Sequence, residues 1–70
     1  MKRRWWFTEQ YWVTEAEQAG ERWRPATEED WRQAEQEDPK AVRSWRRELA
    51  AYEALGRRPE RLPRLWVRIG

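Results

Sequence analysis

The side chains that could do chemistry in this sequence are indoles, guanidinium groups and carboxylates. The 70-residue chain has 7 Trp, 15 Lys and Arg, and 13 Asp and Glu, but no Cys and no His. The absence of Cys and His removes the usual thiolate nucleophile, the usual zinc ligands and the usual general base at neutral pH. What remains is binding chemistry, since indole rings bury or stack and Arg binds carboxylates and phosphates.

No arrangement typical of an active site occurs along the chain. Ser44 is the only serine, and no histidine can activate it. Glu28 and Glu29 are adjacent, so on a helix they point in different directions and do not share a proton-transfer site. The three glycines are scattered, which argues against a phosphate-cradling loop. We therefore expect a protein that is not an enzyme and that uses no cofactor or metal.

The supply of aliphatic side chains limits the core. Val, Leu, Ile and Phe together number nine of the 70 residues. Each Trp buries roughly 150–250 Å², so the core of this chain must be built largely from tryptophan. The length suits one small domain spanning residues 1–70. The excess of Arg over Lys, 13 to 2, fits a GC-rich genome or a thermophile.

Helices must position these side chains, and the clearest one is predicted over residues 39–55. Asp38 is a favourable N-cap, Pro39 suits the first helical position, and Gly56 suits the left-handed residue after the end. Apolar residues recur along this segment at spacings of 3, 4 and 3, namely Val42, Trp45, Leu49 and Tyr52. This stripe faces either the core or a second copy of the chain.

A shorter helix is predicted over residues 28–37. Thr27 suits its N-cap, and the acidic residues Glu28, Glu29 and Asp30 suit the positive end of the helix dipole. Trp31 and Ala34 are its only apolar anchors. Read as a whole, residues 20–31 are predicted to form a strand, a turn at Pro25-Ala26 and the start of this capped helix.

Two alternatives remain open for residues 4–24. In one, Phe7 is a staple residue and Thr8 caps a helix that has Trp12 at N4, then Ala16 and Ala19 on one face, and stops at Gly20. In the other, strands near residues 4–7, 11–14 and 21–24 form a meander, as their aromatic and β-branched side chains favour. Residues 15–19 are good helix formers and favour the first alternative.

The last segment, residues 65–69, alternates in character after Pro63 and is predicted to be a strand. A lone strand needs a partner, and the N-terminal aromatic segment is the candidate. The predicted fold class is therefore α+β, with a few short antiparallel strands, from the N-terminal aromatic segment and the C-terminal strand, packed on helices 28–37 and 39–55. The alternative is an all-α arrangement of three helices.

Charge is divided unevenly along the chain. Residues 1–4 carry +3, residues 5–39 carry −7 from three basic and ten acidic residues, and residues 40–70 carry +6 from nine basic and three acidic residues. These segments either neutralise one another as surface ion pairs, within the chain or across a dimer, or serve separate partners.

The leading hypothesis is a small protein–protein interaction module. It would act as an inhibitor or adaptor, of the kind that phages and mobile elements carry, by docking on a larger protein or nucleoprotein machine and modulating it. Trp is enriched in binding hot spots, and acidic side chains supply charge complementarity. The predicted protein-binding residues are Trp5, Trp12, Glu28, Glu29 and Trp31. Trp45 and Trp66 are predicted to lie in the core.

The alternative hypothesis is a nucleic-acid-binding protein that uses the Arg-rich C-terminal half. Arginines on one helix and in the following loop could track a phosphate backbone, namely Arg43, Arg46, Arg47, Arg57 and Arg58. A third interpretation, binding of a membrane surface by residues 2–7, meets the objection that this segment lacks a sustained apolar face.

The remaining expectations concern location and assembly. No apolar stretch is long enough to span a membrane, and no apolar signal-peptide core follows the first basic residues. We therefore expect a cytoplasmic protein. Homo-oligomerisation stays open under either functional hypothesis.

Overall fold

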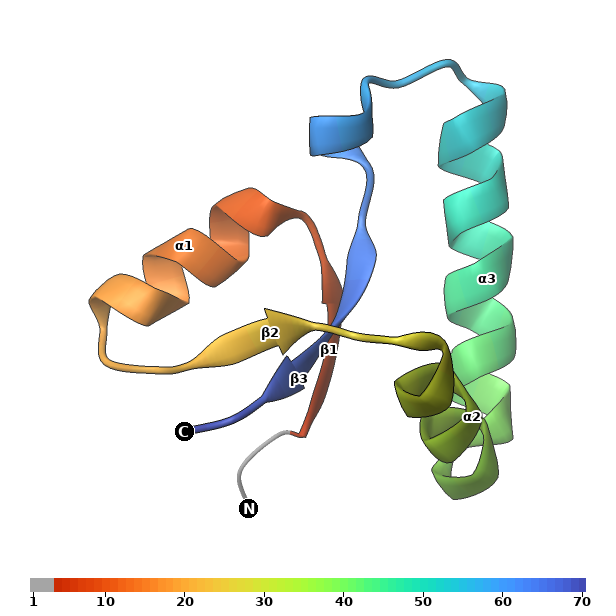
Figure 1. Cartoon of the computed structure of the whole chain (residues 1–70). Helices are drawn as coiled ribbons and strands as arrows, with labels where there is room; N and C mark the ends of the chain where they lie inside the picture. The colour runs from red at the N-terminus through yellow and green to blue at the C-terminus, as the bar shows by residue number, and fades with distance from the viewer. Residues whose placement is uncertain (1–3) are drawn as a thin grey trace.

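The computed structural model describes residues 4–70, and this part of the chain contains three strands and three α-helices (Figure 1). The predicted α+β class is confirmed, and the all-α alternative is wrong. A third helix, which was one of the two alternatives for residues 4–24, joins the predicted helices 28–37 and 39–55. In chain order the elements are β1 (Trp5–Thr8), α1 (Gln10–Gln18), β2 (Trp23–Pro25), α2 (Glu28–Glu37), α3 (Pro39–Ala54), a 3-10 turn (Pro59–Arg61) and β3 (Arg64–Arg68).

The last strand lies between the first two. Both β1 and β2 pair with β3 in antiparallel fashion, which makes the strand order β1-β3-β2. Trp6 lies opposite Trp66 in one pair, and Arg24 lies opposite Val67 in the other. Because β1 and β2 run in the same direction, α1 must cross from one edge of the sheet to the other, so β1, α1 and β2 form a split β-α-β unit.

One face of the sheet is covered by α1. Side chains alternate along a strand, so Trp6 and Trp66 share this face. Val13 of α1 packs against Trp23 and Trp66, with Trp6 and Ala16 beside them. The indole N–H of Trp66 donates a hydrogen bond to the backbone oxygen of Thr8 at 3.0 Å. This layer is therefore an aromatic sheet face closed by two small residues of a short helix.

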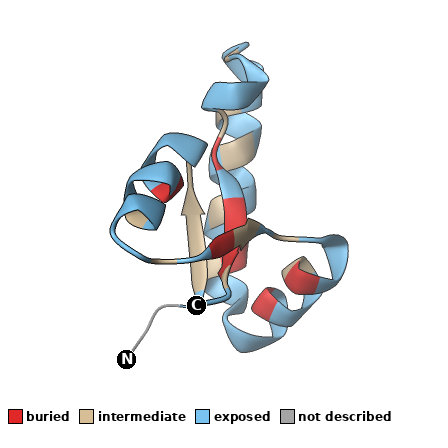
Figure 2. Cartoon of the chain, turned by 60° about the vertical axis from the view of Figure 1, so that its left-hand side comes forward, coloured by how far each residue is buried: buried red, intermediate tan, exposed pale blue. Residues whose placement is uncertain are grey.

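The opposite face is covered by α2 and α3 (Figure 1). Leu65 packs there with Ala34 of α2 and Val42 of α3, and all three side chains are buried. Phe7 stacks on Trp45 of α3, with ring centroids 5.9 Å apart and planes 11° from parallel. Figure 2 shows the buried residues along the strands and on the inner helix surfaces.

Both alternatives for residues 4–24 are partly correct. The strand at 5–8 and the strand at 23–25 exist, but the expected strand near residues 11–14 is wrong, because these residues form the first turns of α1. In a helix, Val13 and Ala16 lie on one side and pack against the tryptophans of the sheet. Thr8 is not the N-cap: Glu9 occupies that position and makes no side-chain cap bond.

The predicted stop of this helix at Gly20 is confirmed. Gly20 has a φ of +96°, which side chains with a Cβ rarely adopt. Its N–H donates to the oxygen of Glu17, and the N–H of Glu21 donates to the oxygen of Ala16. These two bonds satisfy the last carbonyls of the helix in the manner of a Schellman motif.

The second half of the chain follows the sequence closely. The helix α2 has the predicted bounds and is capped by Thr27, and α3 begins at Pro39 after Asp38, whose side chain accepts from the N–H of Ala41 at 3.1 Å. The helix ends at Ala54, one residue earlier than predicted, and β3 begins and ends one residue earlier as well. The apolar stripe of α3 packs on the chain's own sheet through Val42 and Trp45.

Candidate interaction surface

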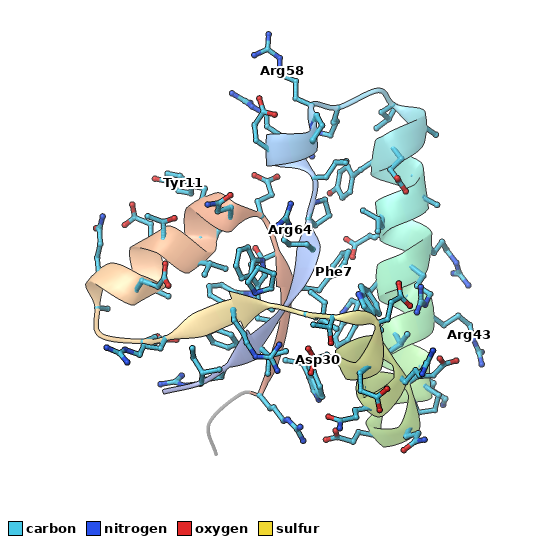
Figure 3. All side chains as sticks on the ribbon, viewed as in Figure 1. Phe7, Tyr11, Asp30, Arg43, Arg58 and Arg64 are labelled. Atoms are coloured by element: carbon cyan, nitrogen blue, oxygen red, sulfur yellow. The ribbon has the colours of Figure 1, made fainter. Side chains whose placement is uncertain are left out.

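The most exposed aromatic side chains lie together at the start of α1. Tyr11 is 60% exposed and Trp12 is 54% exposed. Their rings meet edge to face, with centroids 5.0 Å apart and planes at 85°. We call these two residues the aromatic pair. Figure 3 shows Tyr11 pointing away from the sheet.

The helix presents the aromatic pair outward because of its own pattern. Val13 and Ala16 turn toward the sheet, so Tyr11 lies on the opposite side of the helix. Trp12 lies on the flank between them and stays more than half exposed. Glu15 follows Tyr11 by four residues and Trp12 by three, so an exposed carboxylate lies beside the pair. The helix contains no basic residue. The outer face of α1 is thus aromatic and acidic.

The other predicted protein-binding tryptophans are used inside the fold. Trp5 and Trp31 are half-buried and pack in the cluster under α2 and α3. The ring of Trp31 contacts Phe7 and Trp45 edge to face, at centroid distances of 6.3 and 6.4 Å. The indole N–H of Trp5 is buried and has no hydrogen-bond partner. Neither side chain offers a free face comparable to that of Trp12.

Glu28 and Glu29 are exposed in the first turn of α2, on the opposite side of the sheet from α1. Glu29 forms an exposed ion pair with Arg32, 3.4 Å between Oε2 and Nη1. The five predicted protein-binding residues therefore do not form one surface, because Trp12 lies on one layer and the other four on the opposite side or in the sheet.

Asp30, next to these two glutamates, is buried and structural. Its carboxylate accepts hydrogen bonds from the guanidinium of Arg24 and from the backbone N–H and hydroxyl of Thr27. The hydrogen bond from Arg24 is the main reason that the pKa of Asp30 is held far below its usual range, and the Thr27 backbone bond adds to it. The same contact raises the pKa of Arg24. This carboxylate is occupied by the fold and is not available to a partner.

The predicted nucleic-acid-binding arginines separate into two groups. Arg43 and Arg47 are exposed on the outer face of α3, four residues apart, and Lys40 extends the line by three residues. Figure 3 shows Arg43 pointing away from the domain. Arg46 instead lies over the ring of Trp31, 4.5 Å from guanidinium carbon to ring centroid. We call Lys40, Arg43 and Arg47 the basic stripe.

Arg57 and Arg58 lie beyond the far end of α3. Ala54 follows Arg43 by eleven positions along the helix, which corresponds to about 16 Å. Arg57 forms an ion pair with Glu9, 3.6 Å between Nη1 and Oε1, and covers the ring of Tyr52. Arg58 is exposed and projects from the loop (Figure 3). The five arginines therefore do not form a continuous surface, and Lys2 and Arg3 of the membrane-surface interpretation lie outside the described residues.

The two charged parts of the chain neutralise each other only at isolated points. Within residues 4–70, ion pairs from the basic C-terminal segment to the acidic middle are Arg57–Glu9 and Arg68–Glu21. Neither Arg43 nor Arg47 forms an ion pair in this part of the chain. The basic stripe therefore keeps its charge on the surface.

A shallow hollow of about 220 Å³ lies beside α1, lined by Trp6, Glu21, Trp23 and Arg68. One oxygen of Glu21 accepts from the indole N–H of Trp23 at 3.0 Å and from Arg68 at 3.2 Å. Trp6 and Trp23 contact each other at a centroid distance of 5.2 Å. These bonds join Glu21, Trp23 and Arg68, but the Nε–H of Arg68 is buried without a hydrogen-bond partner. Residues 4–70 contain no cluster of three or more His, Cys, Asp or Glu side chains placed for a metal ion.

Fold and surface together define a small α+β domain whose distinguishing features are an exposed aromatic pair on one layer and a basic stripe on the other. Comparison with known proteins finds no matching family model, no matching curated protein and no matching solved structure. No helix in the described part of the chain is both long enough and apolar enough to cross a membrane.

Sequence reasoning missed Tyr11 and the hollow. Tyr11 could have been found from the spacing of Val13 and Ala16, since a helix that buries these two residues turns Tyr11 to the opposite side. The hollow could not have been found this way, because Trp6, Trp23 and Arg68 come from three different strands.

Proposed function

We propose that the protein is a small non-enzymatic interaction module that docks on a larger protein through the outer face of α1. The observation that supports this most directly is the exposure of Trp12 beside Tyr11. The other six tryptophans are half-buried or buried, so Trp12 is the one tryptophan that the fold leaves exposed. Exposed Trp and Tyr side chains are the types most enriched in binding hot spots.

The surroundings of the aromatic pair indicate the chemistry of the partner. Glu15 lies beside the pair, and α1 has no basic side chain. A partner surface that offers an apolar pocket with Arg or Lys at its rim would bury both rings and pair with the carboxylate. Docking on such a surface would block it or bridge it to another component, which is the action of an inhibitor or an adaptor.

A cytoplasmic location suits a domain held by packing and hydrogen bonds, without cysteine.

Affinity capture with purified baits tests this proposal. The wild-type chain is compared with Trp12→Ala and with Leu55→Ala, a control that removes another exposed apolar side chain, 77% exposed, after the end of α3. A protein retained by wild type and by the control should bind the Trp12→Ala bait at least about 30-fold more weakly, as expected for a hot spot. Equal binding to all three baits would remove the α1 face from the proposal.

A second candidate function, nucleic-acid binding, is favoured by the basic stripe. Lys40, Arg43 and Arg47 are exposed in one line along α3, and no ion pair in residues 4–70 uses the two arginines. Random-sequence DNA and RNA are titrated at about 50 and about 200 mM salt and followed by tryptophan fluorescence. Replacing both arginines by Ala should reduce the salt slope by about two units. The control, Arg22→Ala with Arg61→Ala, removes equal charge at two other exposed positions and should leave the slope unchanged.

A further inference from the structure

The sheet has two edge strands, and the hydrogen bonds show which backbone groups each of them offers. The N–H of Arg68 donates to the oxygen of Arg4 at 2.9 Å, so the backbone groups of even-numbered residues in β1 are directed toward β3. The N–H and C=O groups of Trp5 and Phe7 consequently point away from the sheet. No hydrogen bond within residues 4–70 uses these four groups.

The edge at β2 is protected, whereas the edge at β1 is not. The outward residues of β2 are Trp23 and Pro25, and proline has no N–H to offer. The oxygen of Pro25 also accepts a hydrogen bond from the side chain of Arg24 at 3.3 Å. In β1 there is no proline, and its four residues are half-buried rather than buried. A strand edge of this kind is a template for pairing with another strand.

We propose that β1 pairs in antiparallel fashion with β1 of a second copy of the chain, about a two-fold axis that passes beside Trp6. In this register Trp5 of each copy lies opposite Phe7 of the other. This is the one register in which the backbone N–H and C=O groups of Trp5 and Phe7 in one copy all bond to those of Phe7 and Trp5 in the other, through four hydrogen bonds. The two three-stranded sheets then form one continuous sheet of six strands.

The side chains of β1 are complementary to a second copy in this register. Residues directly opposite each other share a face, so Trp6 meets Trp6 on the α1 side and Trp5 meets Phe7 on the other side. Arg4 lies opposite the neutral Thr8, and its guanidinium already pairs with Glu37 of its own copy at 3.3 Å. No like charges oppose each other within residues 4–8. This self-complementarity is the reason that the occupant of the edge is a second copy.

Sedimentation combined with amide hydrogen exchange tests the pairing directly. Between about 1 µM and about 1 mM, the range of weak protein association, the mass should rise from 8.8 kDa toward twice that value. The amide protons of Trp5 and Phe7 should become protected over the same range, while that of Trp23 on the other edge should not. A mass that stays at 8.8 kDa, or a dimer in which the Trp5 and Phe7 amides exchange as in dilute solution, overturns the proposal.

Two pairs of variants separate the edge from general effects on folding. Thr8→Lys places a positive charge opposite Arg4 of the second copy and should weaken dimerisation at least about tenfold. Gln10→Lys adds the same charge on α1 and should leave it unchanged. Because Thr8→Lys also alters the end of β1, a synthetic chain with an N-methyl group on the Phe7 amide provides a second test, with N-methylation of Trp23 as its control. Dimerisation of the Phe7 derivative with wild-type affinity also overturns the proposal.

Discussion

Arg24 and Asp30 form a two-point ion pair that ties the end of β2 to the first turn of α2. Nη1 lies 2.6 Å from Oδ2, and Nη2 lies 3.1 Å from Oδ1. The same carboxylate accepts from the backbone N–H of Thr27 at 2.8 Å, which completes a capping box. One buried carboxylate therefore holds the turn, the helix end and the neighbouring strand together.

Acid should destabilise the domain through this group. The hydrogen bond from Arg24 lowers the pKa of Asp30 in the folded state, so the unfolded chain binds the proton more readily. The stabilisation is fully present above the unfolded pKa, near about 4, and is lost as the pH falls below it. The free energy of unfolding, measured with urea from neutral pH down to about pH 2, should therefore decrease below about pH 4. In Asp30→Asn this decrease should be smaller, whereas in Glu28→Gln, a change at an exposed neighbour, it should be as large as in wild type.

The same substitution should also lower stability at neutral pH. Asp30→Asn leaves the Arg24 guanidinium without its charged acceptor and weakens the cap at Thr27, for a loss of about 2 kcal/mol in the free energy of unfolding. Chemical denaturation at pH 7 measures this loss. A variant as stable as wild type would show that the ion pair contributes nothing net.

Two Trp→Phe substitutions should lower the free energy of unfolding by different amounts, because the two indole N–H groups have different surroundings. The N–H of Trp66 donates to the oxygen of Thr8, whereas the N–H of Trp5 is buried without a partner. Trp66→Phe should cost about 2–3 kcal/mol from the lost hydrogen bond and the lost packing. Trp5→Phe removes an unsatisfied donor and should cost about 1 kcal/mol or less. Thermal or urea unfolding compares them, and equal costs would contradict the assigned hydrogen bonds.

Substitutions at two neighbouring residues of α1, Trp12 and Val13, should have different effects on the stability of the domain. Val13 is 1% exposed against Trp23 and Trp66, so Val13→Ala should destabilise the domain by about 2 kcal/mol. Trp12→Ala removes a larger side chain but an exposed one, and the change in stability should stay within about 1 kcal/mol. Urea midpoints of the two variants provide the measurement. A greater loss for Trp12→Ala would mean that this indole belongs to the core.

Replacing Gly56 by alanine should destabilise the domain only through the backbone conformation at this position. Its φ is +72°, and nothing lies within 4 Å of where a Cβ would stand. Gly56→Ala should therefore lower the free energy of unfolding by about 1 kcal/mol without any steric clash. Gly56→Asn, which tolerates the left-handed region better, should recover part of the loss. If Ala is as stable as Gly, the helix end must relax at little cost.

Local signals in the sequence were sufficient for the second half of the fold. The Thr27–Asp30 capping box and the Asp38-Pro39 pair act within one turn of a helix, and Gly56 ends α3 because glycine adopts a positive φ readily. The bounds of α2 and α3 could therefore be predicted to within one residue. Of the two residues of the aromatic pair, the sequence pointed only to Trp12, and Tyr11 was missed. The partial burial of Trp5 and Trp31 depends on residues of other elements: Ala34, Val42 and Leu65 for Trp5, and Phe7 and Trp45 for Trp31.

The amino-acid sequence alone therefore favours the α+β fold class and determines the tryptophan-rich core and the ends of the later helices, because these follow from composition and from contacts within a few residues. It does not set the strand order β1-β3-β2 or the helical state of residues 11–14, whose side chains favour strands. Those features follow from burial: in a helix, Val13 and Ala16 cover Trp23 and Trp66, which are distant in the chain. Contacts of this range outweigh local propensity, and the same packing leaves Tyr11 and Trp12 on the surface.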